Sequence, residues 1–468
     1  MRIRQLMHSD LLTRVKWVND RRVHESMHFD VPITLEGTKK WFNGIVGNAS
    51  RADMAFEDKG ELCAMGGFTS IAEDAELYIF VSPDCQGKGL GKIATSLLCE
   101  YGFYNLQLKS IYLFTNGDNF AAQKTYEALG FKLNSIVNNC AKNGKGDVVN
   151  RLKYILCPDD FSPSDKPFLR LDECHFNGFK FKVVRDDIFP FIGGGSKARK
   201  AVEYERFLKE NSYNAVVTCG GVQSNHNRAI ALMAARNGWI CHLCVQGDVE
   251  RFNSEKGNAL LNRLCGAEIE LVKPENTSES MDKAMERLKT EGYNPYYIHG
   301  GGHDLPGGTS FVKAIAELKR QCDKKNYKPD YIFHASGTGS TQAGIVVGLE
   351  RVGWGDVNVI GISVARQHER GKKVIAEFAN MLGLYYGINK DFFDDIIFCT
   401  DYLCGGYEQY NPEMESYLLQ AMKETGLIFD TTYSGKGFYG MMDYIDKMNL
   451  QDKNILFWHT GGIMNIMK

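Results

Sequence analysis

Short apolar runs alternate with helical patterns along most of the chain. Residues 75–81 and 111–115 are apolar runs of strand length, and residues 89–104 and 119–129 repeat apolar positions at helical spacing. Strands that alternate with helices form parallel sheets, whose ligands bind at the carboxyl ends of the strands. The pattern therefore predicts an α/β fold. Later in the chain, further strand-like runs precede helices at 215–218, 240–246, 267–272, 331–334 and 357–364.

A segment rich in turn formers separates these two stretches. Residues 157–168 contain three prolines together with several acidic and small polar residues, a composition typical of a linker. We expect a small α/β or α+β domain over residues 1–156 and a larger α/β domain over residues 169–468. A chain of 468 residues is also too long for one ordinary core.

Charge and hydropathy favour a protein that acts on small molecules. The 55 Lys and Arg residues nearly balance the 57 Asp and Glu residues, so no global charge attracts nucleic acid or anionic membranes. No apolar run reaches the roughly 18 to 20 residues that span a bilayer, and the first residues do not resemble a signal peptide. We expect a cytoplasmic protein with neither nucleic acid nor membrane as a partner.

Thirteen cysteines, an odd number without framework spacing, are typical of reduced thiols. Only Cys241 and Cys244 have the spacing of a metal-binding pair. They lie within the apolar run 239–245, where alternate side chains belong to a buried strand, and no second pair accompanies them. We expect no metal site.

A glycine-rich turn joins the strand at 75–81 to the helix that follows. The turn Gln86-Gly87-Lys88-Gly89-Leu90-Gly91 allows several backbone N–H groups to face one point, beside the positive end of a helix. This arrangement predicts a pyrophosphate site, although a plain tight turn or a mononucleotide loop would have the same pattern.

Two motifs of the first domain resemble those of the GNAT acetyltransferases. The turn matches the family's Q/R-x-x-G-x-G/A loop, and the second motif begins at Asn119 and continues from Tyr126 to Phe131. The resemblance implies that Tyr126 protonates the departing thiolate of acetyl-CoA, although it also fits a packed aromatic residue. Glu76 is a candidate general base, or else a solvated edge carboxylate. The expected cofactor contacts are Gln86, Gly87, Gly89, Gly91 and Asn119.

In the second domain a lysine follows a run of glycines and opens a helical pattern, in Gly193-Gly194-Gly195-Ser196-Lys197. A lysine that forms an imine must lose its proton readily, which desolvation or a neighbouring cation such as Arg199 or Lys200 favours. By itself the motif also fits a phosphate-binding turn or a basic helix start.

Two further turns each follow a strand and open a helix, at residues 219–228 and 336–344. The second offers backbone N–H groups and hydroxyls to one phosphate. With the lysine motif, these turns resemble the fold-type II pyridoxal-phosphate (PLP) enzymes, in the branch with D-cysteine desulfhydrase and 1-aminocyclopropane-1-carboxylate (ACC) deaminase. The resemblance runs from about Arg170 to the C-terminus and implies a tryptophan synthase β-like domain with two α/β subdomains.

The resemblance also implies a set of site residues. Lys197 binds PLP through an imine, Ser224 meets the substrate carboxylate, and Asn225 lies beside the cofactor ring. Ser196 stands where the family usually has Asn. The other expected contacts are Thr338, Gly339, Ser340 and Thr341 for the phosphate, Gln223 and Thr460 for the substrate, and Tyr407 and Tyr433 as active-site tyrosines.

Two positions distinguish the branches of this family. Deaminases have Glu in place of Ser434 and Leu in place of Thr460. A glutamate keeps the pyridine nitrogen protonated, as ring opening demands, whereas a serine hydroxyl donates a hydrogen bond to a neutral nitrogen. The pair therefore favours D-cysteine desulfhydrase-like β-elimination from a small amino acid, with the D enantiomer expected, over ACC deamination.

The joining of the two domains leaves alternatives open. β-Elimination converts the amine into a keto acid, so its product cannot be N-acetylated. The PLP domain could instead be a racemase or β-replacement enzyme that supplies the acetyltransferase, the two domains could serve different substrates, or one domain could be an inactive sensor or scaffold. We expect a homodimer, and we interpret His226 and His459 as structural.

Overall fold

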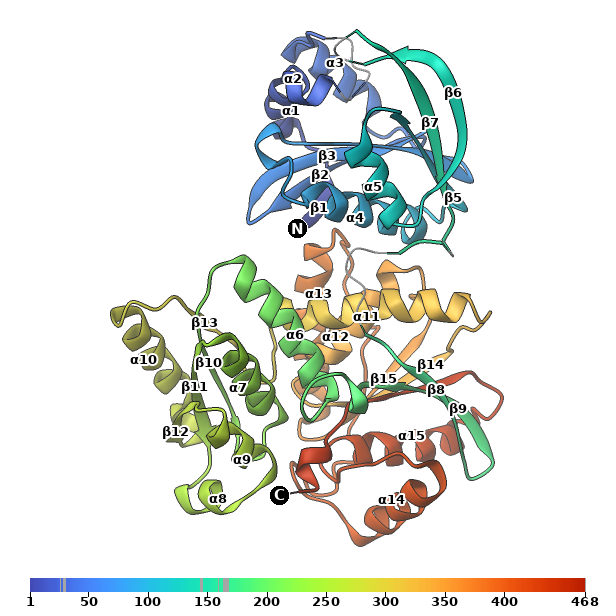
Figure 1. Ribbon diagram of the computed structural model, residues 1–468. Helices are drawn as coiled ribbons and strands as arrows, with labels where there is room; N and C mark the ends of the chain where they lie inside the picture. The colour runs from blue at the N-terminus through green and yellow to red at the C-terminus, as the bar shows by residue number, and fades with distance from the viewer. Residues whose placement is uncertain (26, 28–30, 144–145, 159, 163–167, 468) are drawn as a thin grey trace. The chain divides into compact units, whose positions relative to one another are not determined.

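The computed structural model describes the chain except for residues 26, 28–30, 144–145, 159, 163–167 and 468, and it divides into two compact units, Met1–Lys166 and Pro167–Lys468 (Figure 1). The boundary falls within the expected linker, of which residues 159 and 163–167 lie outside the described residues. Phe161, in the same segment, is buried and its ring lies 5.7 Å from that of Phe103. The apolar ring holds this part of the segment in the core of the first unit.

The described residues of the first unit form a seven-stranded sheet in the order β1-β2-β3-β4-β5-β7-β6. Its strands are β1 (Arg2–Gln5), β2 (Ala52–Asp58), β3 (Glu61–Thr69), β4 (Asp74–Val81), β5 (Ser110–Asn116), β6 (Lys132–Lys142) and β7 (Val148–Leu156). Its helices are α1 (Leu11–Val18), α2 (Arg21–His24), α3 (Leu35–Ile45), α4 (Leu90–Tyr104) and α5 (Phe120–Ala128), with short 3₁₀ turns η1 (His8–Asp10) and η2 (Pro83–Cys85).

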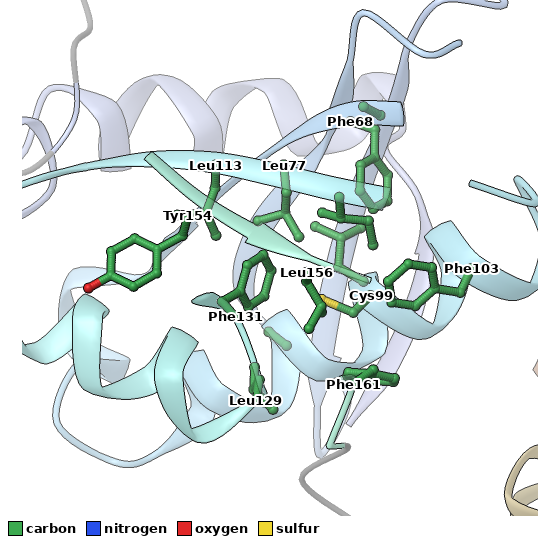
Figure 2. Close-up of a cluster of buried hydrophobic side chains, with 14 of the residues drawn as sticks. Phe68, Leu77, Cys99, Phe103, Leu113, Leu129, Phe131, Tyr154, Leu156 and Phe161 are labelled. Carbon is green, nitrogen blue, oxygen red and sulfur yellow. The ribbon is translucent and has the colours of Figure 1, made fainter. Parts of the chain in front are cut away.

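Two central strands of this sheet, β4 and β5, pair over only part of their length and then separate. β4 and β5 pair in parallel only from Asp74 opposite Ser110 to Glu76 opposite Tyr112, whereas every other neighbouring pair is antiparallel. Beyond Glu76, β4 no longer pairs with β5, so its backbone groups on that side are open to a ligand. Figure 2 shows the apolar core behind the parting strands, where Leu77 and Leu113 lie near side chains from α4.

The second unit contains two largely parallel sheets. The smaller has the order β12-β11-β10-β13 and the larger β16-β15-β14-β17-β9-β8, in which only β8 and β9 are antiparallel. The strands are β8 (Leu171–Phe176), β9 (Phe179–Arg185), β10 (Ala215–Gly221), β11 (Ile240–Gln246), β12 (Glu268–Val272), β13 (Pro295–Tyr297), β14 (Tyr331–Ser336), β15 (Asn358–Ser363), β16 (Ile397–Cys399) and β17 (Ile455–His459).

Helices cover these sheets, which confirms the predicted α/β class with two subdomains. They are α6 (Gly195–Glu210), α7 (Asn225–Asn237), α8 (Val249–Ser254), α9 (Gly257–Leu264), α10 (Thr277–Thr290), α11 (Leu305–Asp323), α12 (Ser340–Arg351), α13 (His368–Tyr385), α14 (Pro412–Thr425) and α15 (Ser434–Met448). Short 3₁₀ turns are η3 (Asp186–Ile188), η4 (Pro274–Asn276) and η5 (Ile463–Asn465). Across the part of the chain that is described, we find no helix with the length and apolarity to traverse a bilayer.

The strand-like runs predicted in the second unit correspond to β10, β11, β12, β14 and β15. The bounds of β11 agree with the prediction, and those of the others differ by one to three residues at an end. The difference is largest at β10, which continues through Cys219, Gly220 and Gly221. Backbone pairing with β11 holds this extension in the sheet although its side chains are not apolar. It carries the chain directly into the cavity described next.

Candidate active sites

A cavity of about 570 Å³ in the second unit is lined from both sheets. Its walls lie at or just beyond the carboxyl ends of β10, β11, β14, β15 and β17, as expected for ligand sites of parallel sheets. The expected site residues on its wall are Lys197, Ser224, Asn225, Thr338, Gly339, Thr341, Tyr407, Tyr433 and Thr460. Three others, Gln223, Ser340 and Ser434, do not line it.

Lys197 reaches this cavity from the first turn of α6. A Cβ at Gly194 would lie 2.2 Å from the Asp187 carbonyl oxygen, and one at Gly195 would lie 2.8 Å from that of Thr460. Both glycines also have positive φ, at 50° and 88°. Only glycine lets the chain pass so close to its neighbours here, and the Ser196 N–H then donates to the Thr460 carbonyl at 2.9 Å.

The ε-amine of Lys197 is buried, and it makes few polar contacts. Its Nζ donates to the Gly301 carbonyl oxygen at 2.8 Å, and burial lowers its pKa to about 8. Desolvation disfavours the charged ammonium, so a far larger fraction of this amine is neutral near physiological pH than of an exposed lysine. A neutral amine is the form that attacks an aldehyde, which is the chemistry expected of this lysine.

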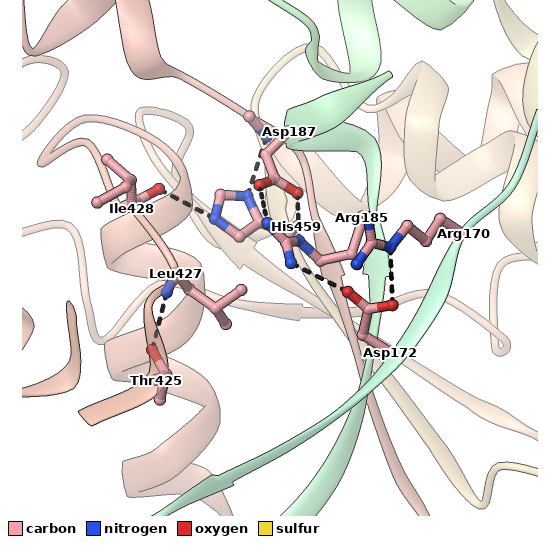
Figure 3. Close-up of polar contacts among 9 residues, drawn as sticks. Arg170, Asp172, Arg185, Asp187, Thr425, Leu427, Ile428 and His459 are labelled. Atoms are coloured by element: carbon pink, nitrogen blue, oxygen red, sulfur yellow. Dashed lines mark hydrogen bonds and ion pairs between the residues drawn. The ribbon is translucent and has the colours of Figure 1, made fainter. Parts of the chain in front are cut away.

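A polar network braces the chain beside the glycine turn (Figure 3). Arg185 donates to the Asp187 carboxylate at 2.8 and 2.7 Å and to Asp172 at 3.1 Å, and Arg170 also donates to Asp172. His459 lies beside Asp187 in the same view. Because Asp187 packs against Gly194, these ion pairs hold the wall on which the lysine turn rests.

His459 itself has both ring nitrogens engaged. Nε2 must donate to the Ile428 carbonyl at 3.0 Å, and Nδ1 then accepts the Gly461 N–H at 3.2 Å. Burial lowers its pKa. These two bonds fix a neutral tautomer and agree with the structural role expected from the sequence.

The turn between β14 and α12 has the geometry of an anion-binding turn. Gly339 adopts φ 98° immediately before α12, and Thr338, Gly339 and Thr341 line the cavity at the helix N-terminus. Ser340 points elsewhere: its Oγ accepts from the Lys200 Nζ at 2.6 Å. Burial and then Lys197 lower the pKa of Lys200. A phosphate at this turn would restore the charge of Lys200, so the residues fit a phosphorylated aldehyde cofactor next to Lys197.

Ser224 and Asn225 form the start of α7 at the cavity wall. The Ser224 Oγ accepts the Asn227 N–H at 3.2 Å as the helix cap, and the Asn225 Oδ1 accepts from Asn258 at 3.1 Å. The expected substrate contact Gln223 has its amide fully used instead. It donates at 2.7 Å to Glu255 and at 3.0 Å to a backbone carbonyl, and it accepts the Asn258 N–H at 2.9 Å. Gln223 therefore positions Asn258.

The two expected tyrosines meet at the cavity. The hydroxyls of Tyr407 and Tyr433 lie 2.5 Å apart. Burial raises the pKa of Tyr407 to about 12, and burial together with Tyr407 raises that of Tyr433. Both phenols are therefore neutral at physiological pH and able to donate a proton.

The two residues that distinguish the branches of the resembling family lie differently. Ser434 is buried behind the wall, where its Oγ donates to Asp430 Oδ1 at 2.7 Å and accepts the Asp430 N–H at 3.1 Å. Thr460 lines the cavity, and its buried Oγ1 has no hydrogen-bond partner among the described residues. Of these two hydroxyls, the one expected at the pyridine nitrogen is engaged with a carboxylate, while that of Thr460 is available.

His226, interpreted from the sequence as structural, lines the cavity. Its Nε2 lies 2.9 Å from Thr218 Oγ1. Since the Thr218 hydroxyl donates to the Ile298 carbonyl, His226 Nε2 must be the donor. Its Nδ1 is then an acceptor, and it has no partner among the described residues.

An ion pair also crosses the cavity. Arg251 of α8, beside the smaller sheet, donates to Glu408 at 2.9 Å, and both residues line the wall. The partners are 157 residues apart in the chain. No local pattern could have identified this pair.

A second cavity, of about 340 Å³, lies in the first unit where β4 and β5 part. Tyr126 and Glu76 both line it. Burial raises the pKa of Tyr126 to about 12, so its phenol is neutral and can give a proton to a leaving group. The arrangement brings a proton donor and a carboxylate to one space, as acyl transfer to an amine requires.

The expected cofactor loop of the first unit does not line this cavity. Gly89 ends the loop with φ 77° at the start of α4, and a Cβ at Gly87 or Gly89 would meet no described atom within 4 Å. The loop is thus open to a ligand at a helix N-terminus. The Gln86 amide donates to the Arg22 carbonyl at 3.1 Å, and the Asn119 Oδ1 accepts the Ala122 N–H at 3.2 Å as the cap of α5.

The cysteines with metal-like spacing are both buried on β11. Cys241 and Cys244 belong to different apolar clusters, as their opposite directions along a strand require. Donor atoms of His242, Cys244 and Glu270 lie within 4.8 Å of one another. The imidazole is already hydrogen-bonded to Glu270 at 3.1 Å, so a metal ion would have to displace an existing bond.

Family models match both units. Residues 166–461 match the model of pyridoxal-phosphate-dependent enzymes, and residues 1–132 match that of the GNAT acetyltransferase domain.

Individual relatives match the second unit over most of their length. A D-cysteine desulfhydrase of Klebsiella pneumoniae is 32% identical over 296 residues, which cover 61% of this chain and 87% of the relative. A Pyrococcus abyssi protein provisionally assigned as a 1-aminocyclopropane-1-carboxylate deaminase is 32% identical over 292 residues, 62% of this chain and 86% of the relative. A crystal structure described as an ACC deaminase homologue aligns with a TM-score of 0.58 and 28% identity. The alignment covers 64% of this chain and 92% of the chain in that structure.

The lowered pKa of Lys197 predicts its reactivity in cofactor-free protein. Competitive labelling with limiting acetic anhydride, followed by peptide mapping, should give half-maximal labelling of Lys197 near pH 8. Labelling should rise from pH 7 and level off above that value, because only the neutral amine reacts. Lys283, whose pKa is raised by Glu279, is the control and should still gain reactivity beyond about pH 9. Half-maximal labelling of Lys197 near the usual lysine value of about 10.4 would contradict the prediction.

Proposed function

The chain belongs to the pyridoxal-phosphate-dependent enzyme family and carries a GNAT acetyltransferase domain, and on this basis we propose that it is a bifunctional enzyme. Its larger unit would catalyse β-elimination from a small amino acid, with D-cysteine as the leading candidate, and its smaller unit would N-acetylate an amine with acetyl-CoA. Both domains were expected from the motifs, and the family matches confirm them. The substrates and the pairing of the activities are the proposal.

The elimination proposal rests on one observation: Lys197 and two possible proton donors, Tyr407 and Tyr433, line the same cavity. When bound, PLP supplies an electron sink for the carbanion at Cα. Lys197, with its lowered pKa, takes the Cα proton at Nζ. The neutral Tyr407 and Tyr433 hydroxyls supply the proton that the departing sulfur needs. D-cysteine and water would yield pyruvate, ammonia and hydrogen sulfide.

Other residues would bind and orient the substrate. The start of α7, with Ser224 and the helix dipole, suits the substrate carboxylate. The anion site at Thr338 to Thr341 suits the cofactor phosphate. Thr460 offers a hydroxyl, and neither it nor Ser434 can protonate a pyridine nitrogen as a carboxylic acid would. This supports elimination of a good leaving group over opening of a cyclopropane ring, and so argues against ACC deaminase.

In the smaller unit, an amine would attack the thioester directly. Glu76 would receive the amine proton, and the Tyr126 hydroxyl would protonate the thiolate of CoA. The loop from Gln86 to Gly91, at the start of α4, would bind the pyrophosphate. We also propose that the chain acts as a homodimer.

The covalent union of the two domains favours one alternative. An amine-preserving reaction in the larger unit, racemisation or β-replacement, would supply a substrate for the acetyltransferase. Lys197 and the tyrosines lie in one cavity and could serve either reaction, because each begins with removal of the Cα proton.

The elimination proposal predicts the products of the purified protein. Incubation with D-cysteine should yield pyruvate and sulfide in equal amounts, while ACC should yield no 2-oxobutyrate. Lys197→Ala should abolish both products, and Lys180→Ala, at an exposed position on β9, should leave them unchanged. Coupled lactate dehydrogenase and sulfide assays measure the rates. Formation of L-cysteine or an N-acetylated amino acid without pyruvate would refute elimination and favour the amine-preserving alternative.

The role of Tyr126 predicts a loss of turnover. Tyr126→Phe should lower kcat for acetyl transfer by about 100-fold while the KM for acetyl-CoA changes little, because the hydroxyl acts on the leaving group. Tyr101→Phe is a matched control, since Tyr101 packs against the same core on α4 without lining the cavity. Release of CoA measured with a thiol reagent reports the rate. Equal kcat in the two variants would exclude Tyr126 as the proton donor.

A further inference from the structure

We propose that the acceptor pocket of the first unit takes an amine that also carries a carboxylate, an α-amino acid, and not a polyamine. The inference rests on the proposed acetyltransferase function and names its substrate class. It comes from the charged residues around the 340 Å³ cavity.

Arginines dominate the charges of this pocket. Arg14, Arg51 and Arg151 line it, and Glu76 is the one carboxylate among its described lining residues. The arginines come from distant parts of the chain, α1, the residue before β2, and β7, and they converge on the space beside Tyr126. A guanidinium forms paired hydrogen bonds with a carboxylate, which makes this a suitable lining for an amino acid.

The Trp41 ring and an ion pair hold two of these arginines in place. The Arg14 guanidinium lies 4.1 Å from the centre of the Trp41 ring, and that of Arg51 lies 5.9 Å from it. Arg51 is also paired with Asp53 at 3.0 Å, and the Tyr78 hydroxyl donates to the same carboxylate. Asp53 is thereby engaged by its partners, and it does not line the pocket. The arginine groups are positioned before any substrate arrives.

Arg151, the third arginine of the pocket, comes from β7. Its guanidinium lies 5.5 Å from the centre of the Phe114 ring, which also lines the pocket. Burial lowers the pKa of both Arg14 and Arg151. Such partly desolvated cations gain from an anionic ligand, because its charge replaces the water that they have lost.

The same charges disfavour a polyamine. A long polycation would have to place ammonium groups beside Arg14 and Arg151, with only Glu76 as a lining counter-charge among the described residues. An α-amino acid avoids this repulsion, since its carboxylate meets the arginines and its amino group can reach Glu76. Amino acids are also the substrate class proposed for the larger unit. N-acetylation would block the amino group that PLP chemistry needs.

The test compares matched acceptors with the full-length chain. Serine and ethanolamine differ only in the carboxylate, and spermidine represents the polyamines. With acetyl-CoA, the kcat/KM for serine, in the better of its two enantiomers, should exceed that for ethanolamine by at least about tenfold. Spermidine should be a poorer acceptor still. Mass spectrometry of the N-acetyl products and CoA release give the rates.

Substitutions on β7 test whether the preference for serine over ethanolamine comes from this pocket. Arg151→Gln should reduce the serine-to-ethanolamine ratio by about tenfold, mainly through the KM for serine, and Arg151→Lys should restore part of it. Lys153→Gln is the matched control, because Lys153 also contacts the Phe114 ring but does not line the pocket. Unchanged binding of CoA by calorimetry shows that each variant is folded.

The outcomes separate this inference from the function on which it rests. Preference for ethanolamine or spermidine, or a ratio that Arg151→Gln leaves unchanged, would overturn the amino-acid acceptor while leaving an acetyltransferase. Acetyl transfer to no amine in the panel would overturn the proposed acetyltransferase function, and this inference with it.

Discussion

The larger site depends on keeping the ε-amine of Lys197 out of water, so that its ammonium form loses a proton more readily than that of an exposed lysine. Burial lowers its pKa to about 8, and its Nζ donates to a backbone carbonyl, that of Gly301. The glycines before α6 make this placement feasible, because a side chain at Gly194 or Gly195 would collide with neighbouring carbonyls. The ion pairs behind Asp187 and the capped start of α7 then fix the surrounding wall.

Much of this architecture could be predicted from the sequence, because it depends on local patterns. Apolar strand runs predicted the α/β class, and the turns after β10 and β14, together with the family resemblance, led us to expect Asn225 and Thr338 at the site whose cavity they line. Residues predicted from motif position, without knowledge of side-chain direction, were less successful. Gln223 and Ser434 are next to wall residues, but hydrogen bonds to Asn258 and Asp430 turn their side chains away.

Groups of charged residues that come together from distant segments could not be predicted from any local sequence pattern. The pair of Arg251 with Glu408 joins two parts of the larger cavity wall, and the arginines of the smaller pocket come from α1, β7 and the residue before β2. Each of these residues resembles an ordinary surface charge in its local context. Only the packing of strands against one another shows that they face the same space, and that packing supplies the substrate preference proposed for the acetyltransferase.

The attachment point of the cofactor tests the account most directly. Holoenzyme reduced with borohydride, digested and mapped by mass spectrometry should carry the pyridoxyl group on Lys197, and reduced Lys197→Ala protein should carry none. Lys200, buried three residues further along α6, is the informative alternative. A label on Lys200 or elsewhere, or no label in the wild-type protein, would contradict the central role of the Lys197 amine.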